Sequence, residues 1–398
     1  HELIVLQYTI ISKKKLNMKK NIFSVLGLMS GTSMDGVDIS LIKTDGYDYF
    51  EQISNKFYEF SDELYKDLIF LRESISELKD LDNKFSIIDE IEKKFTLFNA
   101  QVINEFIKQE QTRPEIIGFH GQTIYHNSKA KISKQLGNGE LLSQLTNCTV
   151  VNNFRKQDLD NYGQGAPLTP IFHYLISNQI NKKNKLTYPI NIINIGGITN
   201  VTTILDNKDI DKQIFAYDIG PGNCLIDEWV RKKSNKKFDE NGSLALSGKA
   251  NQLILNQSID NFQISSIEES MDINDFDISF VKGLNLEDGC ATLNEFTAYL
   301  ISEGLKKINQ INNIVVKNFI ICGGGRKNKK LVENIYKYMS DEKLIIKDID
   351  VYQFDGDFIE SQAFGYLAAR RILGLPITFP TTTRCKNPSL GGQIIKNY

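Results

Sequence analysis

The chain has 398 residues, and its 47 Lys and Arg against 49 Asp and Glu give a formal net charge of −2. This balance indicates neither a nucleic-acid partner nor a membrane surface, and it leaves small neutral or anionic substrates open. A chain of this length is expected to form two domains. Five cysteines without a Cys-x-x-Cys pair argue against a zinc site and a disulfide framework, and they predict a reducing, cytoplasmic compartment.

The first residues do not resemble a targeting segment. Residues 1–16 are apolar and then basic, the reverse of a secretory signal, and they lack a small-residue cleavage site. Met18, followed by Lys19 and Lys20, looks like a natural start, so residues 1–20 are expected to be a disordered leader. No apolar run approaches the roughly 20 residues that a membrane helix needs.

A polar, glycine-rich stretch at 27–38 separates two segments, 21–26 and 39–42, in which apolar and polar residues alternate. This alternation predicts a β-hairpin. The glycines permit positive φ and let backbone N–H groups approach an anion, and the hydroxyl side chains add donors. The stretch is either a phosphate-binding hairpin or only a turn. It matches neither the P-loop nor the Rossmann signature.

The next segments predict helices and then a polar strand end. Residues 61–109 carry apolar residues at helical spacing and predict two or more amphipathic helices. Residues 114–119 predict a strand that ends at His120-Gly121-Gln122-Thr123, which is either one wall of a polar pocket or a turn satisfied by its histidine. A turn at 135–139, a helix at 140–145 and a strand at 149–151 follow.

Arg155 and Asp158 come after that strand, ahead of a glycine-rich turn and a helix at 168–176. An aspartate at the carboxyl end of a strand, close to a basic residue, is typical of a general base in an open α/β sheet. The alternative is a pair of solvated loop charges.

The second half of the chain repeats the pattern of the first. A polar crossover at 181–185 precedes a strand at 190–195, Gly196-Gly197 and a strand at 199–204, which together predict a second hairpin. The strand at 215–219 breaks into Gly220-Pro221-Gly222-Asn223 before a helix. Asp218 and the N-terminus of that helix form a second candidate site for an anion or a metal-bound water.

Glycines also mark the last predicted strand, at 318–322, which follows an amphipathic helix at 291–308 and runs into Gly323-Gly324-Gly325. Three glycines remove the side chains that would obstruct a flat ligand, as an adenine pocket requires. A helix at 361–373 comes next, and the tail at 375–398 is expected to pack back on the surface.

Glycine-bearing strand ends in this order, two of them preceded by hairpins, resemble the duplicated architecture of the actin, heat-shock ATPase and sugar-kinase superfamily. The individual motifs resemble the anhydro-N-acetylmuramic acid kinase family over residues 22–395. The stretches that carry this resemblance are 27–38, Gly121-Gln122-Thr123, Phe154-Arg155 with Asp158, 163–168, 194–197, 218–223 and 322–325. The chain departs from the family pattern at Phe119, Asn153 and Tyr162.

The resemblance implies an α/β fold in which two duplicated ribonuclease-H-like domains of the actin-like ATPase type flank a central cleft. We expect an N-terminal domain at 21–185, a C-terminal domain at 186–374, and hinges near 181–189 and the last helix. The resemblance also implies an ATP- and Mg²⁺-dependent kinase. Such an enzyme hydrolyses the 1,6-anhydro ring of anhydro-N-acetylmuramic acid and phosphorylates O6 in peptidoglycan recycling and amino-sugar catabolism, giving N-acetylmuramic acid 6-phosphate and ADP.

Asp158 matches the general base of the family. Hydrolysis of a glycosidic bond normally takes two carboxyl groups, but one suffices if the departing O6 is captured by the γ-phosphorus of ATP. The expected substrate-binding residues are His120, Gln122, Thr123, Arg155 and Glu360; Arg155 either binds the lactyl carboxylate or orients Asp158. Asp218 is the expected metal residue, with Asp35 as a second candidate. The expected ATP-binding residues are Gly31, Thr32, Ser33, Met34, Asp35, Gly36, Val37, Asp38, Gly196, Gly197, Gly220, Pro221, Gly222, Asn223, Gly323, Gly324, Gly325 and Asn328.

A conventional hexose or N-acetylhexosamine kinase of the same superfamily is the alternative function. In such an enzyme the base deprotonates a sugar hydroxyl and no ring is opened. An ATP-gated binding protein, a different class, would need a peptide-binding domain. The expected partners are the amino sugar and ATP, without nucleic acid or membrane, and a homodimer remains open.

Overall fold

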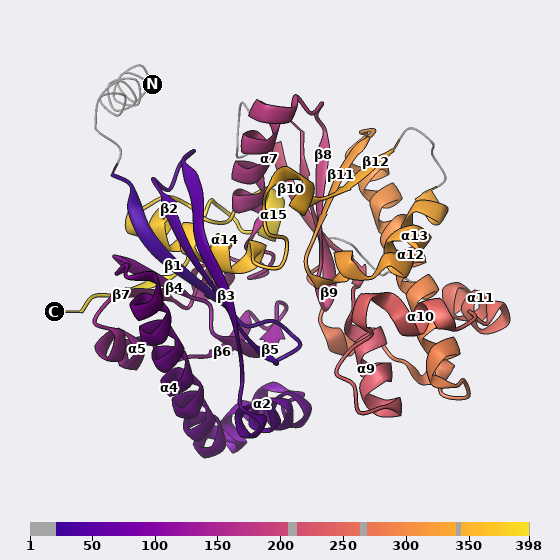
Figure 1. Cartoon of the computed structure of the whole chain (residues 1–398), viewed down its shortest axis with the longest axis horizontal. Coiled ribbons are helices and arrows are strands. Elements are labelled where there is room, and N and C mark those ends of the chain that lie inside the picture. The colour runs from indigo at the N-terminus through magenta and orange to yellow at the C-terminus, as the bar shows by residue number, and fades with distance from the viewer. Residues whose placement is uncertain (1–20, 206–212, 263–268, 340–343, 398) are drawn as a thin grey trace.

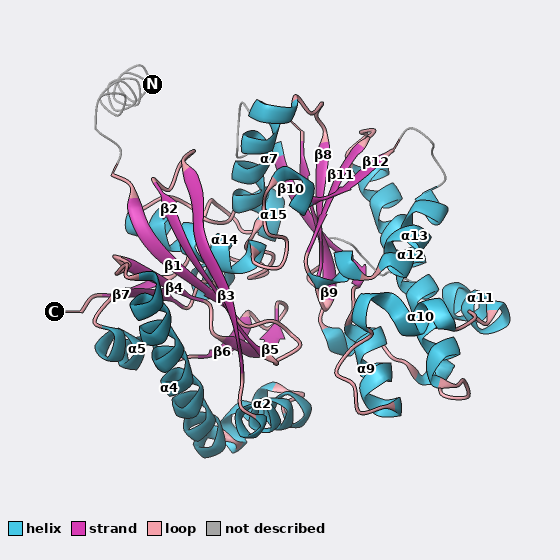
Figure 2. Ribbon diagram, viewed as in Figure 1, coloured by secondary structure: helices cyan, strands magenta, loops and turns pink. Residues whose placement is uncertain are grey.

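The structure is a computed structural model, and it describes residues 21–205, 213–262, 269–339 and 344–397. The predicted leader at 1–20 lies outside these residues. Two β-sheets stand side by side, each covered by helices (Figure 2). None of the helices in the described ranges combines the length and apolar character needed to span a bilayer.

The first sheet has the strand order β13-β7-β4-β1-β2-β3. β1 (Phe23–Met29), β2 (Gly36–Thr44) and β3 (Phe50–Glu59) form an antiparallel meander. β4 (Ile116–Phe119) and β7 (Thr149–Asn152) continue it in parallel, and the C-terminal β13 (Gln393–Ile395) pairs antiparallel with β7. A separate hairpin consists of β5 (Gln122–Asn127) and β6 (Ile132–Leu136), so the turn predicted at 135–139 begins later than expected.

The second sheet has the order β10-β9-β8-β11-β12. β8 (Ile190–Ile195), β9 (Ile198–Ile204) and β10 (Ile214–Pro221) form an antiparallel meander, and β11 (Asn318–Cys322) and β12 (Ile345–Asp348) run parallel to β8. Each sheet therefore joins an antiparallel meander to two parallel strands in the same order. This repeated topology confirms the predicted duplicated fold.

Helices cover both sheets, and local sequence explains their ends and their buried faces. In α2, for example, Ser61 caps the N-terminus by accepting the Leu64 N–H at 3.2 Å, and Leu64, Leu68 and Leu71 are buried. Around the first sheet lie α2 (Asp62–Ser74), α3 (Leu78–Asn83), α4 (Phe85–Glu110), α5 (Gly139–Thr146) and α6 (Lys156–Asp160). The second half contains α9 (Cys224–Lys233), α10 (Ser243–Ser247), α11 (Gln252–Asn261), α12 (Leu286–Ile311), α13 (Lys329–Met339) and the 3₁₀ segments η1 (Glu240–Gly242), η2 (Ile273–Asp275), η3 (Ser279–Val281), η4 (Gly324–Lys327) and η5 (Ile349–Tyr352).

Two further helices, α7 (Pro170–Asn184) and α14 (Ile359–Ile372), form a layer between the sheets (Figure 1). α14 packs on β1, β2 and β4, whereas α7 packs on β9 and β10, and the two helices touch each other. One hydrophobic core runs through both sheets and this layer. We call the first sheet with α2–α6 and α14 the first lobe, and the second sheet with α7 and α9–α13 the second lobe. The predicted ranges 21–185 and 186–374 instead place α7 in the N-terminal domain and α14 in the C-terminal domain.

Glycines set how closely α14 approaches the first sheet. Gly27 of β1 and Gly118 of β4 are paired in register. A Cβ on Gly27 would lie 1.9 Å from the carbonyl oxygen of Ser361, and a Cβ on Gly118 would lie 2.2 Å from that of Phe364. The backbone of the helix thus rests directly on the sheet, which fixes the position of the first turn of α14 and of Glu360 within it.

The C-terminal tail differs from its prediction. Rather than packing on the surface, it contributes buried residues, including Ile377, Thr378, Phe379 and Thr383, to the interior. Its short helix α15 (Pro380–Thr383) packs on β10, while β13 completes the first sheet. The tail is buried because it carries apolar and hydroxyl side chains that fill the space between the two lobes.

Candidate functional site

The first predicted phosphate element is the turn between β1 and β2. Its backbone is fixed from outside, because Arg72 of α2 donates to the Thr32 carbonyl at 3.0 Å and Gln122 donates to the Gly31 carbonyl at 3.1 Å. Within the turn, the Ser33 hydroxyl donates to Asp35 at 2.5 Å. Two candidates, Met34 and Val37, have side chains in the hydrophobic core, so only their backbone is available to a nucleotide.

The second hairpin turn lies opposite the first. A Cβ on Gly197 would lie 2.2 Å from the Thr32 hydroxyl, so the two turns meet across the boundary between the lobes. The Gly220-Pro221-Gly222-Asn223 turn joins them, because the N–H groups of Gly222 and Asn223 donate to the carbonyls of Gly197 and Gly196 at 2.8 and 2.7 Å. The structure therefore brings together three of the four predicted nucleotide elements.

The fourth element, the triple-glycine turn, packs against the end of β8. Gly323 has φ +79°, and a Cβ on Gly325 would lie 2.2 Å from the Ile195 side chain. Gly324 lies near the Asn223 side chain, with an ideal Cβ 3.9 Å from the amide nitrogen. Asn328 behaves differently from its prediction: its side-chain oxygen accepts from Asn294 and from the Leu331 N–H, so it caps α13 inside the protein.

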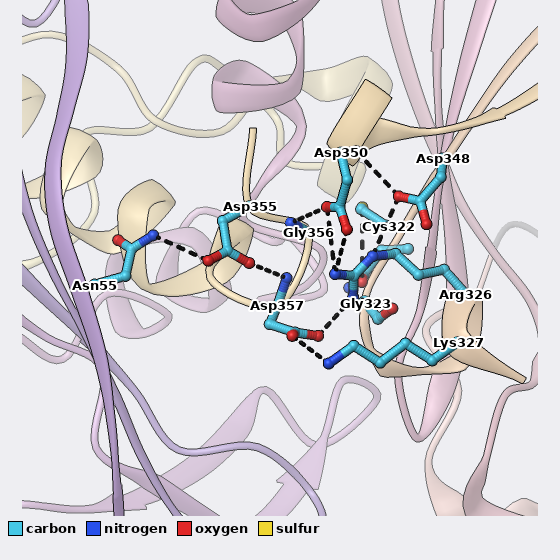
Figure 3. Close-up of polar contacts among 11 residues, drawn as sticks. Asn55, Cys322, Gly323, Arg326, Lys327, Asp348, Asp350, Asp355, Gly356 and Asp357 are labelled. Atoms are coloured by element: carbon cyan, nitrogen blue, oxygen red, sulfur yellow. Dashed lines mark hydrogen bonds and ion pairs between the residues drawn. The ribbon is translucent and has the colours of Figure 1, made fainter. Parts of the chain in front are cut away.

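An ion-pair cluster connects the triple-glycine turn to the segment that precedes α14 (Figure 3). The buried Arg326 guanidinium contacts Asp357 at 2.5 Å, Asp350 at 2.9 Å and Asp348 at 3.2 Å. The Gly323 N–H donates to the Gly356 carbonyl at 3.0 Å. Asn55 of the first lobe reaches Asp355 at 3.5 Å. The triple-glycine turn and the segment leading to Glu360 are thus parts of one hydrogen-bonded unit.

Asp158, on the short helix α6, is fully buried. Its Oδ1 accepts the hydroxyls of Thr378 and Thr383 at 2.5 and 2.6 Å, and its Oδ2 accepts the Gly165 N–H at 2.7 Å. A Cβ on Gly163 would lie 2.1 Å from Oδ2, so glycine is needed there to admit the carboxylate. A carboxylate offers about four acceptor positions. Among the described residues these three donors leave one position on Oδ2, and the Cys385 thiol also lies within hydrogen-bonding reach of the carboxylate and of both threonines.

Arg155 and His120 form a pair beside Asp158. Arg155 donates through Nη2 to His120 Nε2 at 3.0 Å and through Nη1 to the Gly165 carbonyl at 2.8 Å. His120 Nε2 is then an acceptor, so Nδ1 carries the proton and donates to the Gly121 carbonyl at 2.8 Å. Burial and the nearby Arg155 lower the pKa of His120 well below its usual value. The ring is therefore a neutral acceptor that orients Arg155.

Carboxylates from three elements surround the Arg155 guanidinium. Burial lowers its pKa to about 10, and Glu360 of α14, Asp218 of β10 and Asp158 oppose that shift. Burial raises the pKa of Asp218 to about 6, and the Met271 N–H donates to it at 2.9 Å. Burial likewise raises the pKa of Glu360, although Arg155 and a hydrogen bond with Asn194 act to lower it. Two predicted sugar-site residues of the first lobe, His120 and Glu360, therefore meet Asp218 of the second lobe at this arginine.

Gln122 and Thr123 are engaged with neighbouring protein groups. The Gln122 amide donates to the turn between β1 and β2, and its buried side-chain oxygen has no partner among the described residues. Thr123 accepts the Gln135 amide at 3.2 Å. Gln122 therefore keeps one acceptor for a ligand, whereas Thr123 helps to shape the β5–β6 hairpin.

A family model described as anhydro-N-acetylmuramic acid kinase matches residues 23–397. The chain belongs to the anhydro-N-acetylmuramic acid kinase family. One relative of that name, from Pelagibacter ubique, is 50% identical over 379 residues, which cover 94% of this chain and 99% of the relative. Another, from Brucella canis, is 34% identical over 375 residues, covering 93% and 98%.

Solved sugar kinases are more remote from this member of the anhydro-N-acetylmuramic acid kinase family. Hexokinase from Schistosoma mansoni complexed with glucose has a TM-score of 0.42 and 10% identity, covering 87% of this chain and 85% of that chain. A ROK family glucokinase from Streptomyces griseus with glucose and AMPPNP has a TM-score of 0.38 and 11% identity, covering 87% and 99%. The fold assignment rests on the strand order of the two sheets.

The departures from the family pattern can now be placed. Tyr162 and Asn153 have φ +65° and +55°, in the left-handed region that glycine adopts without cost. Phe119 is buried and stacks on Phe95 with ring centroids 6.1 Å apart. Among the described hydrogen bonds, none to Asp158 comes from these three side chains.

Several site residues of this family member escaped the sequence analysis. Arg72 fixes the turn between β1 and β2, and Thr378 and Thr383 hold Asp158. His126, whose pKa is lowered to about 3 by burial and by Arg155, lies 3.4 Å from Ser270 across the lobes. The run of threonines at 381–383 was the one local signal, since hydroxyls clustered in an apolar tail need buried partners.

Proposed function

We propose that this chain hydrolyses the 1,6-anhydro bond of anhydro-N-acetylmuramic acid while it transfers the γ-phosphoryl group of ATP to O6, with Asp158 as the general base. The observation that supports this role is the environment of the Asp158 carboxylate. The carboxylate is fixed by three donors, lies beside Arg155 where residues of both lobes meet, and has one acceptor position on Oδ2 that no hydrogen bond among the described residues occupies.

The proposed reaction needs a single base. Water attacks C1 and gives a proton to Asp158 Oδ2 as the C1–O6 bond breaks. O6 bonds to the γ-phosphorus as the bond from that phosphorus to the β-γ bridging oxygen breaks, which yields N-acetylmuramic acid 6-phosphate and ADP. Phosphoryl transfer depends mainly on positioning and charge neutralisation. The two hairpin turns would supply these through backbone N–H groups, while the Gly222 and Asn223 N–H groups hold the second hairpin turn in place.

Mg²⁺ fits the oxygen-rich lining of this region and would neutralise the phosphate charge of ATP. Among the residues that the structure describes, no three His, Cys, Asp or Glu side chains are grouped so that they could hold a metal ion. Asp35 on the first turn, near Asp227 of the second lobe, is the better placed ligand. Asp218 lies near Arg155 and Arg384, which compete with a cation.

Arg155 serves in this proposal to orient the site. Two of its donors are already bound to His120 and Gly165, while its buried Nε has no partner among the described residues. If Arg155 orients Asp158, Arg155→Lys lowers kcat with little change in KM for the sugar. A selective rise in the sugar KM would instead assign Arg155 to the lactyl carboxylate.

The test is mass spectrometry of the products formed from ATP, Mg²⁺ and anhydro-N-acetylmuramic acid in ¹⁸O-labelled water. We expect the label at C1 together with phosphate on O6. In a parallel arm, Asp158→Asn should bind ATP normally and lose about 10²- to 10⁴-fold in turnover. Equal or faster phosphorylation of N-acetylglucosamine would support the conventional kinase instead. We place the reaction in the cytoplasm, where ATP is available and the five free thiols persist.

A further inference from the structure

The C-terminal tail reaches the carboxylate to which the proposed function assigns the base. We infer that Thr378 and Thr383 of this tail are positioning residues for the reaction, because they fix the direction in which Asp158 accepts a proton. This inference rests on the proposed function of Asp158.

The contacts are short, buried and on one oxygen. Both threonine hydroxyls donate to Oδ1, at 2.5 Å from Thr378 and 2.6 Å from Thr383, and all three side chains are at most 1% exposed. Two donors saturate Oδ1. Oδ2 accepts the Gly165 N–H, so in the part of the chain that the structure describes the remaining acceptor position of the carboxylate belongs to Oδ2 and has a fixed direction.

The tail holds both threonines rigidly. The Thr378 N–H and carbonyl pair with Ser389 at 3.3 and 3.0 Å, and Thr383 lies at the end of α15, where its N–H donates to the Phe379 carbonyl at 3.1 Å. Threonine is also stiff at χ1 because it is branched at Cβ. The hydroxyls are therefore held in place before substrate arrives, which is what preorganisation of a base requires.

The same tail is attached to both lobes. β13 pairs with β7, the strand that leads to Asp158, whereas Arg384 donates to the Ala216 carbonyl of β10 at 3.2 Å and lies 5.0 Å from the centre of the Tyr217 ring. Because Thr383 directly precedes Arg384, a contact to the second lobe and a contact to the base are adjacent in the chain. The direction of the base is thereby tied to the relative position of the lobes.

The experiment compares Thr383→Val, which removes the donor and keeps the shape, with Thr383→Ser, which keeps the donor. We expect Thr383→Val to lose about ten- to hundredfold in kcat, with KM for ATP unchanged, and Thr383→Ser to stay within about threefold of wild type. A loss in kcat without a change in KM for ATP, rescued by serine at the same position, is a result that a merely structural role would not give. Thr378 takes the same pair of substitutions.

Thr381→Val is the matched control, because the Thr381 hydroxyl lies in the same run of threonines and has no hydrogen-bond partner among the described residues. Its kcat should equal that of wild type. If Thr383→Val lowers the melting temperature while kcat stays unchanged, the threonines only fasten the tail and the inference is wrong.

Asp158→Asn separates this failure from failure of the proposed function. An active Asp158→Asn overturns Asp158 as the base, whatever the threonine variants do. An inactive Asp158→Asn with a fully active Thr383→Val overturns only the role of the tail. Adding Thr383→Val to Asp158→Asn should cost no further activity, because the two residues act as one unit.

Discussion

Replacement of Gly27 by alanine tests whether the close contact between β1 and α14 sets the geometry of the site. The new Cβ would lie 1.9 Å from the Ser361 carbonyl oxygen and 2.5 Å from the Gly365 nitrogen, both backbone atoms that cannot rotate away. An ordinary C···O contact is about 3.3 Å, so the first turn of α14 must shift by about 1.4 Å. Glu360 lies in that turn and must move with it.

We expect two measurable effects of Gly27→Ala. Overpacking costs about 1–3 kcal/mol, and the upper end applies because backbone meets backbone. For a lobe of this size, about 3 kcal/mol corresponds to about 6–12 °C in melting temperature. A displacement of about 1 Å at a catalytic site costs about a hundredfold. Calorimetry and steady-state kinetics at 25 °C, where the variant is still folded, measure the two effects separately.

Gly283→Ala is the control, because a Cβ there meets nothing within 4 Å and its φ needs no glycine. It should change the melting temperature by less than about 1 °C and leave kcat unchanged. If Gly27→Ala behaved like Gly283→Ala in both assays, the close contact would not position the site, and the reasoning from the glycines would be refuted.

Three other predictions concern the nucleotide side. Burial and then the nearby Glu360 raise the pKa of Asp38 to about 8, so folding favours its protonated form and the stability of the wild type falls as pH rises from about 4 through about 8. The melting temperature of Asp38→Asn should therefore rise relative to that of wild type between about pH 6 and about pH 9. Parallel curves of melting temperature against pH would contradict this. Arg326→Met removes the guanidinium from Asp348 and Asp350 and leaves Asp357 with Lys327 as its remaining ion-pair partner, which should cost about 2 kcal/mol by denaturant titration. It should also raise KM for ATP more than KM for the sugar, and equal effects on the two KM values would contradict a link between the cluster and the nucleotide. Arg72→Met should weaken ATP binding by about tenfold in calorimetric titration through loss of its hydrogen bond to the first turn, and unchanged affinity would remove Arg72 from that role.

The sequence predicted the parts of the fold that have local causes. Alternating residues on both sides of a glycine-rich turn specify a hairpin wherever they occur, and both hairpins appear as expected. Gly323 carries the positive φ that its turn requires. Asp158 lies just after β7, as the pattern of a strand followed by charged residues predicted.

Long-range contacts account for what the sequence did not predict. Thr378 meets Asp158 across 220 residues of chain, and a pair so far apart leaves no local periodicity to find. The sequence predicted a helix at 361–373, but a helix prediction does not say which of two similar sheets the helix covers. Asn328 follows a glycine turn as a ligand residue would, yet the N-cap position and a buried amide partner turn its side chain inward.

The layer of α7 and α14 has a consequence for how the protein can be divided. α7 comes before residue 185 and seals the second sheet, whereas α14 comes after it and seals the first. A break at residue 185 would leave the sheet in each fragment with an exposed hydrophobic face, because the helix that packs on that face would be in the other fragment. The two halves should therefore be soluble only when produced together, so co-expressed fragments should reassemble where single fragments precipitate.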